Sequence, residues 1–405
     1  MKVLYFAEHF DTPATGGGLR PYQMARRLIQ KGHQVTMVCG GDHKRLGLAE
    51  SGKNNIYRGV IDGIDVVQIS MPYSNNDGIG KRSWIFLRFA RKAIRIAMKE
   101  NYDLLFATST PLTDGLPGIA AKWFRKKKFV FEVRDLWPEL PKALGMKNPF
   151  LLWGMSVLEK CSYHAADACV GLSPGICEGI IRRSQKGKPV AMIPNGCDLD
   201  LFAPSPDKPE VIPGVKPTDT VAVFTGAHGV ANGLDAVLDM AKVLRDKNRD
   251  DIKLVFVGEG KMKSYLMERA AMENLSNCIF LGNMPKKELS DVMSRADIGM
   301  MVLANVPAFY YGTSPNKFFD YIASGLPVVN NYPGWLADLI NANHCGIAVK
   351  PEKPELFADA VIQMAEHPEM RKEYGKNARA LAEREFARDL LGVRFVDFLE
   401  KTSVS

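Results

Sequence analysis

Short apolar runs alternate with amphipathic segments in two successive rounds along this chain of 405 residues. The runs of the first half lie at residues 3–7, 34–39, 104–108, 129–133 and 168–171. Those of the second half lie at residues 221–225, 254–257, 278–281, 299–303 and 328–330. Strands that alternate with helices predict parallel sheets with helices on both faces. The chain is therefore predicted to be an α/β protein with two Rossmann-like, doubly wound domains.

A proline-rich stretch separates the two rounds. Six prolines fall within it: Pro194, Pro204, Pro206, Pro209, Pro213 and Pro217. Such a stretch is typical of a linker with extended pieces. We expect domains at residues 1–190 and 218–385, a linker at 191–217, and a last helix at 386–405 that packs back on the first domain. Ligands of open α/β sheets bind at the carboxyl ends of the strands, so we expect the two domains to face a cleft.

Charge is divided unevenly between the halves. Residues 1–200 hold 29 Lys and Arg against 18 Asp and Glu, a net of +11, and residues 201–405 hold 24 against 27, a net of −3. A basic first half indicates an anionic partner: nucleic acid, anionic lipid or pyrophosphate. The seven cysteines are scattered and odd in number, and no apolar run approaches the roughly 20 residues of a spanning helix, so a cytoplasmic location is expected.

One basic surface carries aromatic side chains. On a helical wheel, the basic residues from Lys81 to Lys99 fall on one arc together with Trp84, and residues 123–128 add a second cluster. Such a face suits an anionic membrane surface, and a solvated outer helix is the alternative.

The stretch from Ser314 to Val329 carries the strongest chemical signal. Pro315 suits a first helical turn, where free backbone N–H groups can bind an anion. Lys317 and Asp320 are three residues apart, which predicts that they lie close together on one helical surface. The pattern offers an acid for sugar hydroxyls beside a cation for phosphate. The alternative is an ordinary helix–turn–strand with a solvated Asp and Lys.

Glycines follow several of the expected strands, where they allow a pyrophosphate or sugar to approach the backbone. The candidate binding residues from these loops are Gly17, Gly18, Gly226, Lys261 and Asn283. The first loop does not complete the dinucleotide pattern Gly-x-Gly-x-x-Gly, although Asp42 keeps an NAD-dependent Rossmann enzyme open as an alternative.

Two further strings contain charged residues. Arg134 and Asp135 follow the strand at 129–133, and we expect them where that strand meets the cleft. Asp198 and Asp200 form an Asp-x-Asp, which holds a metal in other transferases. Here the string opens the proline-rich linker, so we interpret it as a turn and expect no metal.

Four strings, taken in order, resemble the family 4 glycosyltransferases of the GT-B fold. They are Gly17-Gly18 with 31–36 (KGHQVT), Arg134 to Glu139 (RDLWPE), Ile193 to Asp198 (IPNGCD) with Phe202, and Ala323 to Pro327 (ASGLP). The second string resembles a WbuB-like group associated with N-acetyl-L-fucosamine transfer in O-antigen and capsule assembly. The resemblance implies retention of configuration, a UDP-sugar donor, and a lipid-linked saccharide acceptor at the cytoplasmic face of the inner membrane.

The chain departs from the family at the donor site. The family commonly has two glutamates eight apart, and here the second position is Asp320 and the first is Gly312. The family's diphosphate-binding Arg and Lys are replaced near His228 and Asn232. The diphosphate therefore needs another cation, for which Lys317 is the first candidate and Lys261 the second.

The resemblance implies roles for the remaining residues. Arg134, Asp135 and Lys317 are the expected catalytic residues, Asp320 the ribose ligand, and Ser314 and Asn316 the neighbours of the donor sugar. No cofactor and no metal are expected. A nucleic-acid-binding protein stays open on charge alone, although no nucleic-acid-binding signature is present and no such partner is expected.

Overall fold

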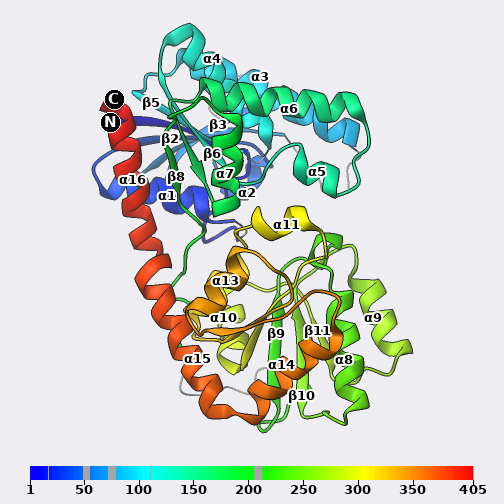
Figure 1. Ribbon diagram of the computed structural model, residues 1–405. Helices are drawn as coiled ribbons and strands as arrows, with labels where there is room; N and C mark the ends of the chain where they lie inside the picture. Colours follow the sequence, from blue (N-terminus) through cyan, green and yellow to red (C-terminus); the bar gives the residue numbers. More distant parts are fainter. Residues whose placement is uncertain (17, 49–54, 72–78, 110, 205–211, 405) are drawn as a thin grey trace. The chain divides into compact units, whose positions relative to one another are not determined.

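The computed structural model describes residues 1–16, 18–48, 55–71, 79–109, 111–204 and 212–404. The chain divides into two compact units (Figure 1). Unit 1 comprises Met1–Pro194, Gly312–Ser314 and Asp389–Ser405, and unit 2 comprises Asn195–Tyr311 and Pro315–Arg388.

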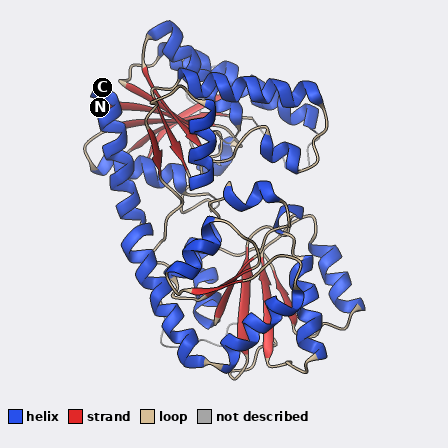
Figure 2. Ribbon diagram, in the orientation of Figure 1, coloured by secondary structure: helices blue, strands red, loops and turns tan. Residues whose placement is uncertain are grey.

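Unit 1 is built on an eight-stranded sheet with the order β3-β4-β2-β1-β5-β6-β7-β8. The strands are β1 (Lys2–Phe6), β2 (Gln34–Cys39), β3 (Ile56–Ile61), β4 (Ile64–Ile69), β5 (Leu104–Thr108), β6 (Lys128–Val133), β7 (Ala168–Gly171) and β8 (Val190–Met192). All neighbours pair in parallel except β3 and β4, which form an antiparallel hairpin at one edge. The central strands are buried along nearly their whole length, because helices cover both faces (Figure 2).

One face of this sheet packs against a first group of helices. They are α3 (Ile79–Lys99), α4 (Gly115–Arg125), α6 (Pro149–Ala165) and α7 (Pro174–Arg183). Phe89 of α3, Ile119 of α4 and Tyr163 of α6 share one buried cluster with the strands. The crossover segments also contain α2 (His43–Leu46), η1 (Leu112–Asp114) and α5 (Glu139–Ala143).

The opposite face packs against α1 (Arg20–Gln30) and α16 (Arg388–Val404). The ring of Phe395 on α16 lies 5.0 Å from that of Phe106 on β5 in an edge-to-face pair. The last helix of the chain thus completes the core of unit 1, although 288 residues of sequence separate these two rings.

Unit 2 is built on a six-stranded, fully parallel sheet with the order β11-β10-β9-β12-β13-β14. The strands are β9 (Thr220–Thr225), β10 (Ile252–Val257), β11 (Cys278–Leu281), β12 (Ile298–Met301), β13 (Val328–Asn330) and β14 (Gly346–Ala348). The connecting and covering segments are η2 (Val230–Asn232), α8 (Asp235–Asp246), α9 (Lys263–Met272), α10 (Lys286–Arg295), α11 (Pro307–Tyr311), α12 (Asn316–Ala323), α13 (Trp335–Ala342), α14 (Pro354–Glu366), α15 (Pro368–Leu381) and the π-helical turn η3 (Ala382–Phe386).

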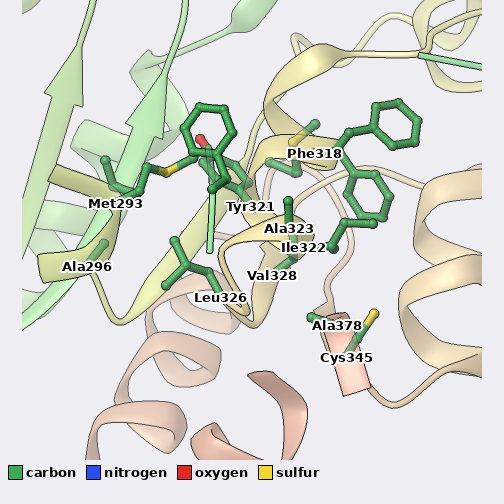
Figure 3. Close-up of a cluster of buried hydrophobic side chains, with 14 of the residues drawn as sticks. Met293, Ala296, Phe318, Tyr321, Ile322, Ala323, Leu326, Val328, Cys345 and Ala378 are labelled. Atoms are coloured by element: carbon green, nitrogen blue, oxygen red, sulfur yellow. The ribbon is translucent and has the colours of Figure 1, made fainter. Parts of the chain in front are cut away.

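The core of unit 2 fixes the position of α12. Phe318, Tyr321 and Ile322 point into a buried apolar cluster that also includes Val328 of β13 (Figure 3). Gly299 lets the ring of Tyr321 pack on β12, because a Cβ atom there would lie 2.5 Å from the ring. Every residue of α12 from Phe318 to Ala323 is buried, so the helix is anchored on several sides.

The predicted α/β class and the doubly wound parallel sheets are confirmed. The sequence interpretation omitted the β3–β4 hairpin, β8 and β14. The chain ends in consecutive helices from Pro354 onward, and the last of them, α16, begins near the start predicted for it at residue 386. Among the described residues, no helix is long and apolar enough to cross a bilayer.

Candidate active site

Lys317 lies in the first turn of α12, beside the glycine loop that follows β9. Its Nζ donates a hydrogen bond to Oδ1 of Asn232 at 2.8 Å and lies 3.9 Å from the centroid of the Phe224 ring. Among the residues that the structure describes, no acidic side chain forms an ion pair with it, and burial lowers the pKa of Lys317 to about 7. A bound anion would stabilise the charged form of such a desolvated ammonium more strongly than that of an ammonium in water.

Glycine makes this approach feasible. Gly226 has a φ of 128°, and a Cβ atom there would lie 3.3 Å from Cε of Lys317. Gly258, with a φ of 140°, packs directly against the carbonyl of Gly226. Because L side chains rarely adopt these conformations, the two loops require glycine to lie together at the carboxyl edge of the sheet.

Asn316 and Pro315 complete the start of α12. Pro315 is the N-cap residue and Asn316 is the exposed first helical residue. The first N–H groups of a helix have no partner within the helix, so this start adds backbone donors next to Lys317. Ammonium group and helix start together form a site with the chemistry of a phosphate receptor.

His228 occupies the same glycine loop but is fully buried. The centroid of its ring lies 6.1 to 6.4 Å from those of Phe224, Phe256 and Phe280. Neither ring nitrogen has a hydrogen-bond partner among the described residues. Burial, and then the charge of Lys263, lower the pKa of His228 to about 4. The imidazole is therefore neutral near pH 7 and supplies no cation for a diphosphate.

Asp320 does not lie beside Lys317 as the spacing predicted. Its carboxylate is 6% exposed and lies 3.9 Å from Nζ of Lys286, at the start of α10. Burial raises the pKa of Asp320, and the charges of Lys286 and Arg388 oppose that rise. Lys317 is half-buried and turns instead to the glycine loop. The prediction of a joint surface was wrong because the helix is buried on several sides, so each side chain meets a different neighbour.

The other candidates of unit 2 are solvent-exposed. Lys261 and Asn283 are exposed, in the loops after β10 and β11. Lys263, two residues beyond Lys261, is engaged: its Nζ contacts Oε1 of Glu259 at 2.6 Å and the carbonyls of Gly258 and Leu281 at 3.1 and 3.0 Å. Lys263 therefore ties two loops together, and Lys261 keeps its charge available to solvent.

The corresponding edge of unit 1 carries carboxylates. Glu132, near the end of β6, is 1% exposed and forms a 2.7 Å ion pair with Arg20 at the start of α1. Burial works against the charge of Glu132, but Arg20 overcomes it and holds the pKa of Glu132 below its usual range. Arg20 also donates to the carbonyls of Ile193 and Pro194. The sequence interpretation missed this pair; an acidic residue within a buried strand was the available signal.

Arg134 and Asp135 follow β6 directly and are partly exposed. The backbone N–H of Arg134 donates to Oγ of Ser109 at 3.0 Å, which joins the ends of β5 and β6. Burial raises the pKa of Asp135, and the adjacent Arg134 opposes that rise. The two side chains thus lie at the carboxyl edge of the unit 1 sheet.

Two carboxyl groups, those of Glu8 and Asp114, lie near the ends of β1 and η1. The backbone N–H of Glu8 donates to Oδ2 of Asp114 at 2.9 Å. Within the described ranges, Oε2 of Glu8 and Oδ1 of Asp114 have no hydrogen-bond partner. Burial raises the pKa of both groups. Two carboxyl groups so close together favour the protonated form near neutral pH.

The remaining predicted residues are dispersed. Gly17 lies outside the described residues. Gly18 is exposed, and its backbone hydrogen-bonds the carboxylate of Asp11. Ser314 is grouped with unit 1. Asp198, from the Asp-x-Asp string, forms a 2.8 Å ion pair with Arg388.

Comparison with known proteins matches both units to one class of enzyme. Residues 14–201 match the model of Glycosyltransferase Family 4, and residues 208–381 match that of Glycosyl transferases group 1. The chain belongs to the family 4 glycosyltransferases. The predicted family and enzyme class are confirmed, whereas the WbuB-like group stays a prediction.

The relatives of this glycosyltransferase are distant. It is 26% identical over 159 residues to a D-rhamnosyltransferase WbpZ from Pseudomonas aeruginosa, across 39% of each chain. It is 25% identical over 219 residues to a GDP-mannose-dependent monoacylated alpha-(1-6)-phosphatidylinositol monomannoside mannosyltransferase from Corynebacterium glutamicum. That match covers 51% of this chain and 55% of the relative, so the chain spans at most about half of these relatives.

A solved structure confirms the GT-B fold. Anabaena HepE in complex with UDP superimposes with a TM-score of 0.70 at 16% identity, covering 99% of this chain and all of that one.

Proposed function

We propose that this chain transfers a sugar from a nucleotide-sugar donor, with retention of configuration, to a lipid-linked saccharide in surface polysaccharide biosynthesis. The observation that carries the proposal is Lys317. Its ammonium lies at a helix start beside a glycine loop. The resemblance to the family implies that the usual diphosphate ligands are replaced in this chain, near His228 and Asn232.

Lys317 and the start of α12 would stabilise the negative charge that develops on the leaving diphosphate. Such preorganised donors act in a partly dry site, where they cost little reorganisation during the reaction. A bound diphosphate would also raise the pKa of Lys317 and hold it charged. Asp320 would accept hydrogen bonds from the ribose hydroxyls, and Lys286 would hold that carboxylate ionised.

Unit 1 would supply the acceptor side. Arg134 and Asp135 lie at the carboxyl edge of its sheet, and we assign them to sugar or acceptor contacts. The lipid-linked acceptor is supported by the relative from Corynebacterium glutamicum, whose name specifies a phosphatidylinositol mannoside. The basic face of α3 would hold the enzyme on the anionic inner leaflet.

The donor is proposed as a UDP-sugar, with N-acetyl-L-fucosamine or a related N-acetylhexosamine as the sugar. The UDP complex of Anabaena HepE supports the nucleotide, and the string Arg134 to Glu139 supports the sugar. The transfer is proposed to need no divalent metal, because Asp198 of the Asp-x-Asp string is paired with Arg388. Activity should then survive EDTA. Loss of activity in EDTA, followed by recovery on adding Mn²⁺, would contradict the proposal.

The decisive experiment screens UDP-, GDP- and dTDP-sugars and NAD for thermal stabilisation. A ligand at 100 times its Kd stabilises the folded state by about 2.7 kcal/mol, which shifts the melting point by several degrees. We expect one UDP-sugar to do so, and Asp320→Ala to lower its affinity by about tenfold or more. Stabilisation by NAD alone would favour the alternative of an NAD-dependent Rossmann enzyme instead.

A further inference from the structure

The first turns of α6 expose an apolar surface that the donor and acceptor chemistry does not use. Phe150 is 82% exposed and Trp153 is 69% exposed, and Leu151 and Val157 are also exposed. No residue from Pro149 to Leu158 carries a charge. A soluble helix normally buries such residues, so an uncovered set of this kind indicates a docking surface.

These turns extend beyond the sheet of unit 1. Oε1 of Glu159 accepts a hydrogen bond at 3.1 Å from the backbone N–H of Trp137, which lies four residues past the carboxyl end of β6. From that point α6 continues along the sheet toward β7. The residues before Glu159 therefore lie past the carboxyl edge, where none of the described strands covers them.

The start of α3 reaches the same edge on the same face. Phe89 packs next to Gly40, the residue that follows β2, so the preceding turns also lie past the edge. Trp84 and Leu87 in these turns are more than half exposed. The guanidinium of Arg88 lies 5.1 Å from the centroid of the Trp84 ring.

We propose that this apolar rim, defined as Phe150, Leu151, Trp153 and Val157 of α6 with Trp84 and Leu87 of α3, inserts into the interface of an anionic lipid bilayer. The occupant is a bilayer because of the charge around the rim. Residues 79–99 hold seven basic and no acidic residues, and residues 140–158 hold two basic and no acidic residues. Aromatic and aliphatic side chains bordered by cations match an anionic interface.

The same charges disfavour a second copy of the chain as the occupant. A twofold interface places identical surfaces against one another, so the basic residues around the rim would face their own copies. The inference rests on the proposed function in one respect: a lipid-linked acceptor would explain why a sugar transferase needs a bilayer.

Flotation separates insertion from simple charge attraction. Wild-type protein should float with phosphatidylethanolamine–phosphatidylglycerol vesicles and retain part of that binding at 1 M salt, where surface attraction is screened within about 3 Å. The double variant Phe150→Ser/Trp153→Ser should lower the partition coefficient by about tenfold or more. Each substitution removes the favourable free energy of transferring an apolar side chain from water into the bilayer. Val60→Ser/Met272→Ser, which replaces equally exposed apolar residues elsewhere, should float like wild type.

Tryptophan quenching tests the depth directly. Vesicles with brominated acyl chains should quench the fluorescence of wild type, and Trp153→Phe should remove part of the quenched signal while Trp335→Phe in unit 2 should not. Equal flotation of wild type and the Phe150/Trp153 variant would overturn the proposal. The proposal would also be overturned if wild type did not bind vesicles and sedimented as a dimer, while the Phe150/Trp153 variant sedimented as a monomer.

Because the vesicles contain no acceptor, the outcome is independent of the transfer reaction. The Phe150/Trp153 variant should keep the thermal stabilisation by the donor, since its substitutions lie in unit 1. Vesicle binding without any thermal stabilisation by nucleotide sugars would support insertion of the apolar rim and contradict the proposed sugar transfer.

Discussion

The two units share a parallel α/β architecture but present opposite chemistry at the carboxyl edges of their sheets. Unit 1 contains most of the basic charge of the chain, yet its sheet edge carries the buried carboxyl groups of Glu8, Asp114 and Glu132. Unit 2 is slightly acidic, yet a half-buried, uncompensated Lys317 lies at its edge. Net charge therefore identifies the surface that each unit presents, and not the ligand that its site binds.

The difference also separates groups that stabilise the fold from groups kept ready for a ligand. Arg20 and Glu132 form an ion pair with each other, so their interaction stabilises the folded chain. Lys317 has an amide and an aromatic ring as neighbours, and no counter-ion lies within the described part of the chain. Four experiments test whether the two edges differ in this way.

The largest expected effect is on the stability of unit 1. Glu132→Ala leaves Arg20 buried without its partner, which should lower the free energy of unfolding by about 3–5 kcal/mol. Urea denaturation followed by circular dichroism measures it. Asp389→Ala removes a pair to Arg27 whose carboxylate is 90% exposed, and should cost at most about 1 kcal/mol. Equal costs in the two variants would contradict the structural role of Glu132.

In unit 2 the corresponding substitution should affect function and spare the fold. Lys317→Met should lower sugar transfer by about 10²–10³-fold, the usual effect of removing one preorganised donor from a charge-stabilising site. Its melting temperature should not fall, because a desolvated cation is replaced by an apolar side chain of similar length. Lys247→Met, which removes an exposed pair with Asp359, serves as the control. If Lys317→Met transferred sugar at the wild-type rate, Lys317 would not be the group that stabilises the leaving diphosphate.

Titration sharpens the same contrast. Because the pKa of Lys317 is about 7, the free enzyme loses the ammonium as the pH rises from 7 to 9. A bound diphosphate requires that proton, so the affinity for UDP should fall over this range by up to about tenfold per pH unit. Calorimetry at pH 7, 8 and 9 measures the slope, and Lys317→Met should show almost none. A flat profile for wild type would mean that Lys317 does not contact the diphosphate.

Part of this contrast was visible in the sequence. Apolar runs predicted most strands because central parallel strands are buried on both faces. The β3–β4 hairpin was missed because its outer strand is half-exposed and lacks a continuous apolar run. The glycine loops and Lys317 are local signals within short strings. The pairing of Arg20 with Glu132 was hidden because 112 residues separate them.

The direction of Asp320 shows a second limit. Spacing of three residues predicts neighbours on an isolated helix. In the folded chain the two side chains are directed by different neighbours, Lys286 for Asp320 and Asn232 for Lys317. Both neighbours belong to helical segments that follow other strands, η2 after β9 and α10 after β11. The sequence around α12 does not indicate either contact.

The smallest expected effect concerns the Glu8–Asp114 pair. Burial raises the pKa of both carboxyl groups above their unfolded values of roughly 4, so the folded state holds protons that the unfolded state releases. Their contribution is fully present below pH 4 and is lost as the pH rises through the folded pKa values. Glu8→Gln keeps the shape without the charge, so this variant should lose less stability than wild type between pH 5 and pH 9. Urea denaturation at both pH values tests this, with the exposed Glu366→Gln in unit 2 as the control. If Glu8→Gln leaves the pH dependence unchanged, the pair is ionised in the folded protein, and the acidic edge of unit 1 would be a charged site like that of unit 2.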